Sequence, residues 1–191
     1  MTTLVLLLWI LFWPGAQDAS KPVRVVIETT AGEIEAEIDA VRAPITAANF
    51  LKYVDAGLFD GGRFFRTVRP DNQVEKPVKI AVIQAEGNRE RRREFFPAIA
   101  LERTNVTGLT HKDGTLSMAR STPDTARDSF SICVGAQPAL DFGGGRQPDG
   151  QGFAAFGQVV RGMDVVRTIQ TSPATGETLT PAVTITRVRR R

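Results

Sequence analysis

The sequence contains few of the residues that cross-link small domains or bind metal ions. Among its 191 residues there is one cysteine, Cys133, and one histidine, His111. A single cysteine excludes a disulfide within the chain, and the pair argues against a zinc site of cysteine and histidine ligands. Cys133 lies in an apolar run, where a free thiol usually packs as a small buried hydrophobe, and His111 is interpreted as a turn residue ahead of a strand. We expect neither a metal ion nor a cofactor.

The chain has only a small excess of charge of one sign. It has 24 lysines and arginines and 21 acidic residues, which gives a net charge of +3. The excess is concentrated in two arginine clusters, at residues 89–93 and 187–191. Such runs are usually solvated loops or tails, and no RNA-binding motif, helix-turn-helix pattern or zinc spacing accompanies them. We expect no nucleic-acid partner; a nucleic-acid-binding surface is the alternative, and it predicts an affinity that falls steeply with salt.

Both tryptophans lie in an unbroken apolar run from Leu4 to Trp13. This length is typical of the core of a secretory signal and is short for a membrane span. The run predicts a signal peptide over about residues 1–19, cleaved between Ala16 and Ser20. The mature domain, residues 20–191, would then be periplasmic or secreted, with no stable membrane insertion after cleavage. An uncleaved membrane anchor is the alternative.

The chain from residue 23 onward alternates apolar and polar residues over short stretches. Between Ile34 and Ile38 the apolar positions alternate with acidic ones, which is typical of a strand with one buried face. Ala31-Gly32 joins this strand to the run at 23–29 as a hairpin. Further strands are predicted at 64–68, 82–84, 115–119, 130–134, 153–160 and 183–188, and helices at 44–54 and 163–169. Many short strands with two helices indicate a single mainly β domain, a barrel or a sandwich.

Several short motifs follow one another along residues 23–188. They are Ala43-Pro44-Ile45-Thr46, Phe59-Asp60-Gly61-Gly62, Phe64-Phe65-Arg66, Val82-Ile83-Gln84, Gly114-Thr115-Leu116-Ser117-Met118-Ala119, Phe130-Ser131-Ile132-Cys133, Leu140-Asp141 and Phe156-Gly157-Gln158-Val159-Val160. In this order they resemble the cyclophilin-type peptidyl-prolyl cis-trans isomerases. The resemblance implies a closed eight-stranded antiparallel β-barrel capped by two α-helices, with proline-containing polypeptides as substrates.

The resemblance also implies roles for individual residues. Arg66 matches the catalytic arginine of the family, and Gln84 matches the glutamine that orients it. Substrate-binding roles are implied for Phe65, Val82, Met118, Ala119, Ser131, Leu140 and Phe153.

The implied proline pocket departs from the family pattern. Ser131 stands where a phenylalanine is usual, and Phe153 and Phe65 each stand where a histidine is usual. Val82 occupies a position that is typically methionine. We expect the Phe153 ring to replace part of the wall missing at Ser131, and the glycine-rich insert at 141–152 to line the groove. That insert is not a phosphate-binding loop, because it lacks the lysine-then-hydroxyl ending and no helix pattern follows it.

Two functions remain open at this point. The first is a monomeric, exported peptidyl-prolyl isomerase that accelerates the folding of exported proteins, with Arg66 stabilising the twisted amide. The second is a catalytically weakened proline-peptide binding module or chaperone that uses the same groove, which the altered pocket favours.

Overall fold

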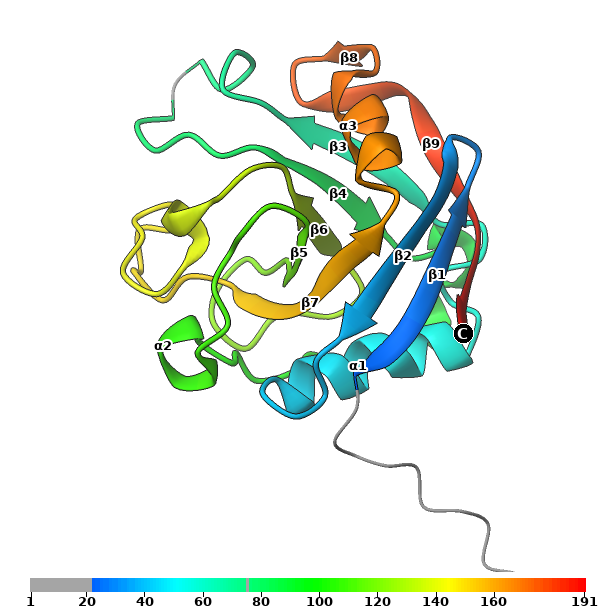
Figure 1. The fold of residues 1–191 in the computed structure, drawn as a ribbon, viewed down its shortest axis with the longest axis horizontal. Coiled ribbons are helices and arrows are strands. Elements are labelled where there is room, and N and C mark those ends of the chain that lie inside the picture. Colours follow the sequence, from blue (N-terminus) through cyan, green and yellow to red (C-terminus); the bar gives the residue numbers. More distant parts are fainter. Residues whose placement is uncertain (1–21, 75) are drawn as a thin grey trace, which may run out of the picture.

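Eight antiparallel strands close into a barrel in the computed structural model, which describes residues 22–74 and 76–191 (Figure 1). The predicted signal peptide lies outside the described residues. Around the barrel the strand order is β1-β2-β7-β5-β6-β4-β3-β9, and β9 pairs with β1 to complete the ring. The strands are β1 (Val23–Thr29), β2 (Gly32–Ile38), β3 (Arg63–Val68), β4 (Val82–Glu86), β5 (Thr115–Met118), β6 (Phe130–Cys133), β7 (Ala154–Arg161) and β9 (Thr178–Arg190). The predicted eight-stranded barrel is confirmed.

The predicted hairpin at the start of the domain is β1 and β2. Gly32 begins β2 with φ of 131°, a conformation that side-chain-bearing residues rarely adopt. The apolar residues Ile34, Ala36 and Ile38 are fully buried, as their alternation with acidic residues predicts. The closing strand β9 is longer than the predicted 183–188, because its first residues form a hairpin with the two-residue strand β8 (Ala174–Thr175).

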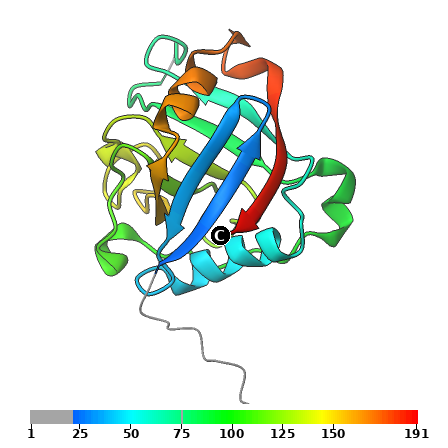
Figure 2. The same cartoon turned by 45° about the vertical axis from the view of Figure 1, so that its right-hand side comes forward.

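Two helices close the opposite openings of the barrel, as Figures 1 and 2 show. Helix α1 (Pro44–Asp55) begins at a proline, whose fixed φ suits a first helical turn. Helix α3 (Met163–Thr171) packs against β2, β3 and β4. The structure adds elements that the sequence pattern did not indicate: the four-residue helix α2 (Thr104–Thr107) and two 3-10 turns, Arg89–Glu94 and Pro138–Leu140.

Aromatic rings fill the barrel between α1 and the strands. Phe50 of α1 is fully buried and lies 5.2–5.3 Å, between ring centroids, from the rings of Phe59, Phe130 and Phe156. Burial of one such side chain contributes about 2–3 kcal/mol, so this cluster is a main source of the fold's stability.

Two absences are established for residues 22–74 and 76–191. None of the helices there is long and apolar enough to cross a bilayer. No group of three or more histidine, cysteine or acidic side chains is placed to hold a metal ion. Cys133 is a free, fully buried thiol, and burial raises its pKa, which keeps it protonated and unreactive.

Candidate active site

Four neighbouring strands carry a row of polar side chains across the outside of the barrel. Arg66 on β3 pairs with Gln84 on β4. Gln84 in turn pairs with Ser131 on β6, and Ser131 with Ser117 on β5. Directly opposed residues have Cβ atoms about 5 Å apart, so the row forms one continuous surface. The residues that alternate with this row belong to the barrel core: Ile83, Ile132 and Leu116.

A β-bulge turns Arg66 toward this surface. Residues two apart on a regular strand share a face, yet Phe64 is fully buried in the core and Arg66 lies half-buried outside it. The register between β3 and β4 shifts between these two residues, which leaves Phe65 as an extra residue. A bulge re-aims the side chains around it. Phe65 is not among the residues that line the pocket described below; its structural effect is to bring Arg66 outward.

Two acceptors fix the guanidinium of Arg66. Its Nη1 donates a hydrogen bond to Oε1 of Gln84 at 2.9 Å. Its Nε donates to Oε2 of Glu177 at 2.8 Å, and Nη2 donates to the same carboxylate oxygen. Glu177 lies in the turn between β8 and β9. The side chains of Arg66 and Glu177 are 34% and 25% exposed, so the ion pair is partly removed from water and holds the arginine more firmly than a surface pair would.

The amide of Gln84 is itself oriented by a further hydrogen bond. Its Nε2 donates to Oγ of Ser129 at 3.0 Å, and Ser129 Oγ donates to the carbonyl of Ala85 at 2.7 Å. Because the amide nitrogen has its acceptor in Ser129, the amide oxygen faces Arg66. Ser129 therefore orients the arginine indirectly.

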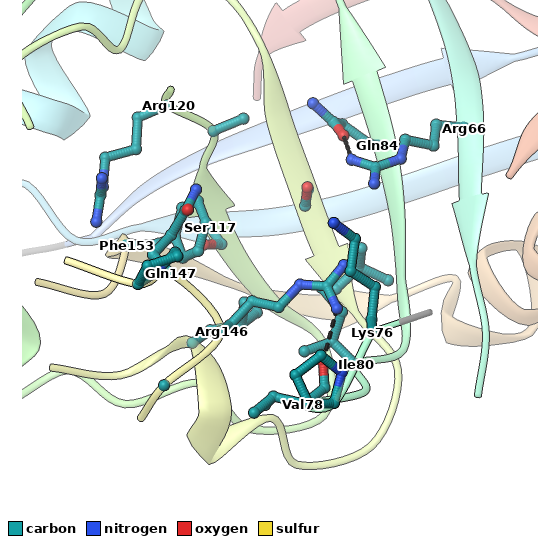
Figure 3. Close-up of a pocket in the computed structure, with 17 residues that line it drawn as sticks. Arg66, Lys76, Val78, Ile80, Gln84, Ser117, Arg120, Arg146, Gln147 and Phe153 are labelled. Carbon is teal, nitrogen blue, oxygen red and sulfur yellow. Dashed lines mark hydrogen bonds between the residues drawn. The ribbon is translucent and has the colours of Figure 1, made fainter. Parts of the chain in front are cut away.

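The polar row borders a pocket with a volume of about 560 Å³ (Figure 3). Its lining includes seven of the sequence-predicted site residues: Arg66, Gln84, Val82, Ala119, Ser131, Leu140 and Phe153. The apolar floor is a buried cluster that contains Val82 and Leu140, each 3% exposed, with Phe153 packed against it. An apolar hollow beside a fixed cation suits a proline ring whose amide lies near the guanidinium.

The structure does not place Met118 in the pocket, contrary to the prediction from the sequence. Met118 is 1% exposed and belongs to the barrel core, and it does not line the pocket. Strand alternation explains this, because Ser117 points to the pocket side of β5 and its neighbour Met118 must point to the other side.

The glycine-rich segment at 141–152 forms one wall of the pocket, as expected from its position in the sequence. Arg120 anchors it: the fully buried guanidinium donates to both carboxylate oxygens of Asp149, at 2.7 and 2.9 Å, and through Nε to the carbonyl of Gly152 at 2.8 Å. These hydrogen bonds lower the pKa of Asp149 to about 2. The guanidinium also lies 5.2 Å from the ring centroid of Phe153. Arg120 therefore fixes both the wall and its aromatic residue. The wall residues that line the pocket are Gly145, Arg146, Gln147 and Pro148.

A buried hydrogen-bond chain lies behind the pocket. His111 was predicted to be a turn residue, but it lies just before the turn that leads into β5, and its side chain is fully buried. Nδ1 lies 2.6 Å from Oδ1 of Asp141, and Nε2 lies 2.8 Å from Oγ of Ser117. The connectivity resembles a hydrolase triad, yet Ser117 is only 2% exposed, which blocks attack on a polypeptide carbonyl. We interpret the chain as a brace between β5 and the wall that follows Leu140.

The burial of His111 predicts a pH-dependent stability. Burial lowers the pKa of His111 from its usual 6.5, against the opposing effect of Asp141. As the pH falls through about 6.5, the unfolded chain therefore binds more protons than the folded chain, and the free energy of unfolding decreases. As the pH is lowered from about 7 to about 5, a range above that in which carboxylates ordinarily titrate, the melting temperature of the wild type should fall. The melting temperature of His111→Gln should change less. Equal slopes for the two proteins, measured by thermal denaturation, would contradict this.

Three charged residues near Arg66 were missed by sequence reasoning. Glu177 is 111 positions away from Arg66 in the chain, and Lys76 and Arg146 lie in loops that line the pocket. A charged residue in a loop or turn does not by itself indicate a position near the pocket, because such residues are usually solvated.

Comparison with known proteins shows the family to which this chain belongs. The family model described as "Cyclophilin type peptidyl-prolyl cis-trans isomerase/CLD" matches residues 24–190. The chain belongs to this family. A peptidyl-prolyl cis-trans isomerase of Acinetobacter baylyi is 34% identical over 150 residues, covering 78% of this chain and 72% of that protein. Peptidyl-prolyl cis-trans isomerase A of Dickeya dadantii is 34% identical over 148 residues, covering 77% and 70%.

A solved structure shows that the fold is shared as well. The crystal structure of a Cryptosporidium parvum cyclophilin has a TM-score of 0.68 at 18% identity and covers 89% of this chain and 98% of that one. The family model and the two relatives show that the chain is a cyclophilin-type peptidyl-prolyl isomerase, an enzyme class that interconverts the cis and trans forms of X–Pro bonds.

Proposed function

We propose that Arg66 is the residue through which this cyclophilin accelerates X–Pro isomerisation, and that Gln84 orients it. Rotation about a peptide bond loses roughly 18–20 kcal/mol of resonance. An isomerase must therefore bind the twisted amide more tightly than either planar form. In the twisted state the proline nitrogen becomes basic, and a nearby guanidinium gains hydrogen bonds that are strongest at that point. The fixed geometry of Arg66 is the observation that carries this proposal.

The hydrogen bonds of Arg66 leave donors for the substrate. A guanidinium has five N–H groups; one is used by Gln84 and two by Glu177. The remaining two, one on each terminal nitrogen, are available to the migrating carbonyl oxygen or the proline nitrogen. Because the arginine is already oriented, little reorganisation is needed when the amide twists.

We further propose that the clients are exported proteins. The apolar run at Leu4–Trp13 supports a periplasmic or secreted location. We expect the mature domain to act as a monomer, without nucleic acid or stable membrane insertion. Expression of the full chain in an exporting host should yield a protein that lacks about residues 1–19, measured by mass spectrometry. Retention of the whole segment in the membrane fraction would favour the anchor instead.

An NMR exchange experiment on a short Ala-Pro peptide separates catalysis from binding alone. We expect the mature domain to increase the exchange between the cis and trans peptide signals at substoichiometric concentration. Chemical-shift changes without faster exchange would favour the alternative, a weakened proline-peptide binding module.

The role of Glu177 gives a second prediction for the same site. Glu177→Ala removes the partner of Nε and Nη2 of Arg66, so the guanidinium becomes free to rotate. We expect kcat to fall about tenfold with a smaller change in KM. Glu177→Gln keeps an acceptor oxygen and should recover much of the loss. If both variants retained wild-type kcat in a protease-coupled assay, the carboxylate would have no positioning role.

A further inference from the structure

The charged side chains that line the active-site pocket all carry the same sign. Figure 3 draws 17 lining residues; four of them are basic, and none of these 17 is acidic. The chain as a whole has 24 basic and 21 acidic residues, so the composition of the pocket is a local enrichment. The four basic residues are Arg66, Lys76, Arg120 and Arg146.

Two of these four cations are already neutralised. Arg66 forms an ion pair with Glu177, and Arg120 binds both oxygens of Asp149. Both carboxylates stand outside the set of residues that line the pocket. Among the residues that the structure describes, the pocket surface therefore keeps an unbalanced positive charge from Lys76 and Arg146.

The acceptors that hold the side chain of Arg146 within the described residues are neutral. Its Nη1 donates to Oε1 of Gln73 and to the carbonyl of Val78, both at 2.7 Å. These two contacts fix the side chain against the loop before β4. Within the described residues, Nε and Nη2 of Arg146 have no hydrogen-bond partner, and no carboxylate lies within salt-bridge distance. Its planar donor edge is thus left for a ligand.

The surroundings of Arg146 favour the arrival of an anion. Burial and the charge of Arg66 lower the pKa of Arg146, with Glu177 opposing them. A guanidinium that is partly desolvated is stabilised when an anion binds. Lys76 is exposed, and in Figure 3 its side chain extends along the same side of the pocket as Arg146.

We propose that Arg146 and Lys76 select polypeptides that carry a carboxylate side chain next to the proline. This inference rests on the proposed use of the pocket for proline. With the ring on the floor beside Val82 and Leu140, a glutamate or aspartate at an adjacent position reaches the donors of Arg146. A bidentate guanidinium–carboxylate contact provides both affinity and geometric selection.

The test uses peptides with blocked ends that differ in one residue. Glutamate, glutamine or lysine is placed either directly before or directly after the proline, and all other residues are neutral. Binding is measured by NMR titration, and exchange spectroscopy on the same samples gives kcat/KM. At low ionic strength we expect the glutamate peptide to bind about tenfold more tightly than the glutamine peptide in at least one position, and the lysine peptide more weakly than either. High salt should reduce the difference.

Matched variants locate the effect. In Arg146→Gln the ratio of glutamate to glutamine affinity should fall toward one, whereas Arg146→Lys should keep part of the preference. Lys76→Gln, at an exposed position that does not threaten folding, should reduce the ratio as well. Arg24→Gln makes the same charge change on β1, outside the pocket, and should leave the ratio unchanged.

The outcomes distinguish this inference from the proposed function. Equal binding and equal catalysis of the glutamate and glutamine peptides would overturn the selectivity while leaving the isomerase intact. A glutamate preference without accelerated exchange would support the selectivity and overturn the catalytic proposal. A preference that persists in both Arg146→Gln and Lys76→Gln would overturn the assignment to these residues.

Discussion

Replacing Arg66 by alanine is expected to lower kcat/KM for X–Pro isomerisation by about 10²–10³-fold, the range seen when a transition-state hydrogen-bond donor is removed. The loss should lie mainly in kcat, because the guanidinium interacts most strongly with the twisted amide and the apolar floor still binds the proline ring. A protease-coupled assay on an Ala-Pro-Phe peptide measures the rate, and NMR titration of the same peptide measures binding.

Two further substitutions control for this result. Arg66→Lys keeps the charge but loses the planar donors, so its rate should fall between those of the wild type and the alanine variant. Arg63→Ala removes an arginine from the same strand. The side chain of Arg63 is 41% exposed, forms an ion pair with Glu86 and does not line the pocket. This variant should retain the wild-type rate. Equal rates for wild type and Arg66→Ala would remove Arg66 from the mechanism.

The individual strands and helices could be predicted because their signals are local. Two such signals are the alternation around Ile34–Ile38 and the apolar stripe of α1, which is formed by Ala47, Phe50, Leu51 and Val54. Each predicts which face is buried without knowledge of its partner strand. The closure of β9 onto β1 is not local, and the resemblance to a known family supplied it. The short helix α2 was not predicted, because four residues are too few to show a helical repeat of apolar positions.

The site could be predicted only in part, for two different physical reasons. The sequence already argued against placing both Met118 and Ala119 in the pocket, since they are neighbours on the predicted strand 115–119 and neighbouring strand residues point to opposite faces. The bulge at Phe65 could not be predicted from the sequence, because a one-residue register shift depends on how β3 pairs with β4. The contacts of Arg66 with Glu177, and of Arg146 with Gln73, join segments that are far apart in the chain. No pattern in either segment encodes such a pairing.

The stability of the site depends on the aromatic core directly beneath it, and Phe130→Ala tests this dependence. Phe130 is fully buried and its ring meets those of Phe50, Phe59 and Phe64 nearly edge-on. It also precedes Ser131 on β6, so a cavity at Phe130 lies behind the pocket. We expect a loss of about 3–5 kcal/mol in the free energy of unfolding and a decrease of about 10 °C in melting temperature, measured by denaturant titration and calorimetry. Phe142→Ala makes the same change at a side chain that is 43% exposed and should alter stability by no more than about 0.5 kcal/mol. Similar losses in the two variants would mean that the ring cluster does not dominate the stability of the barrel.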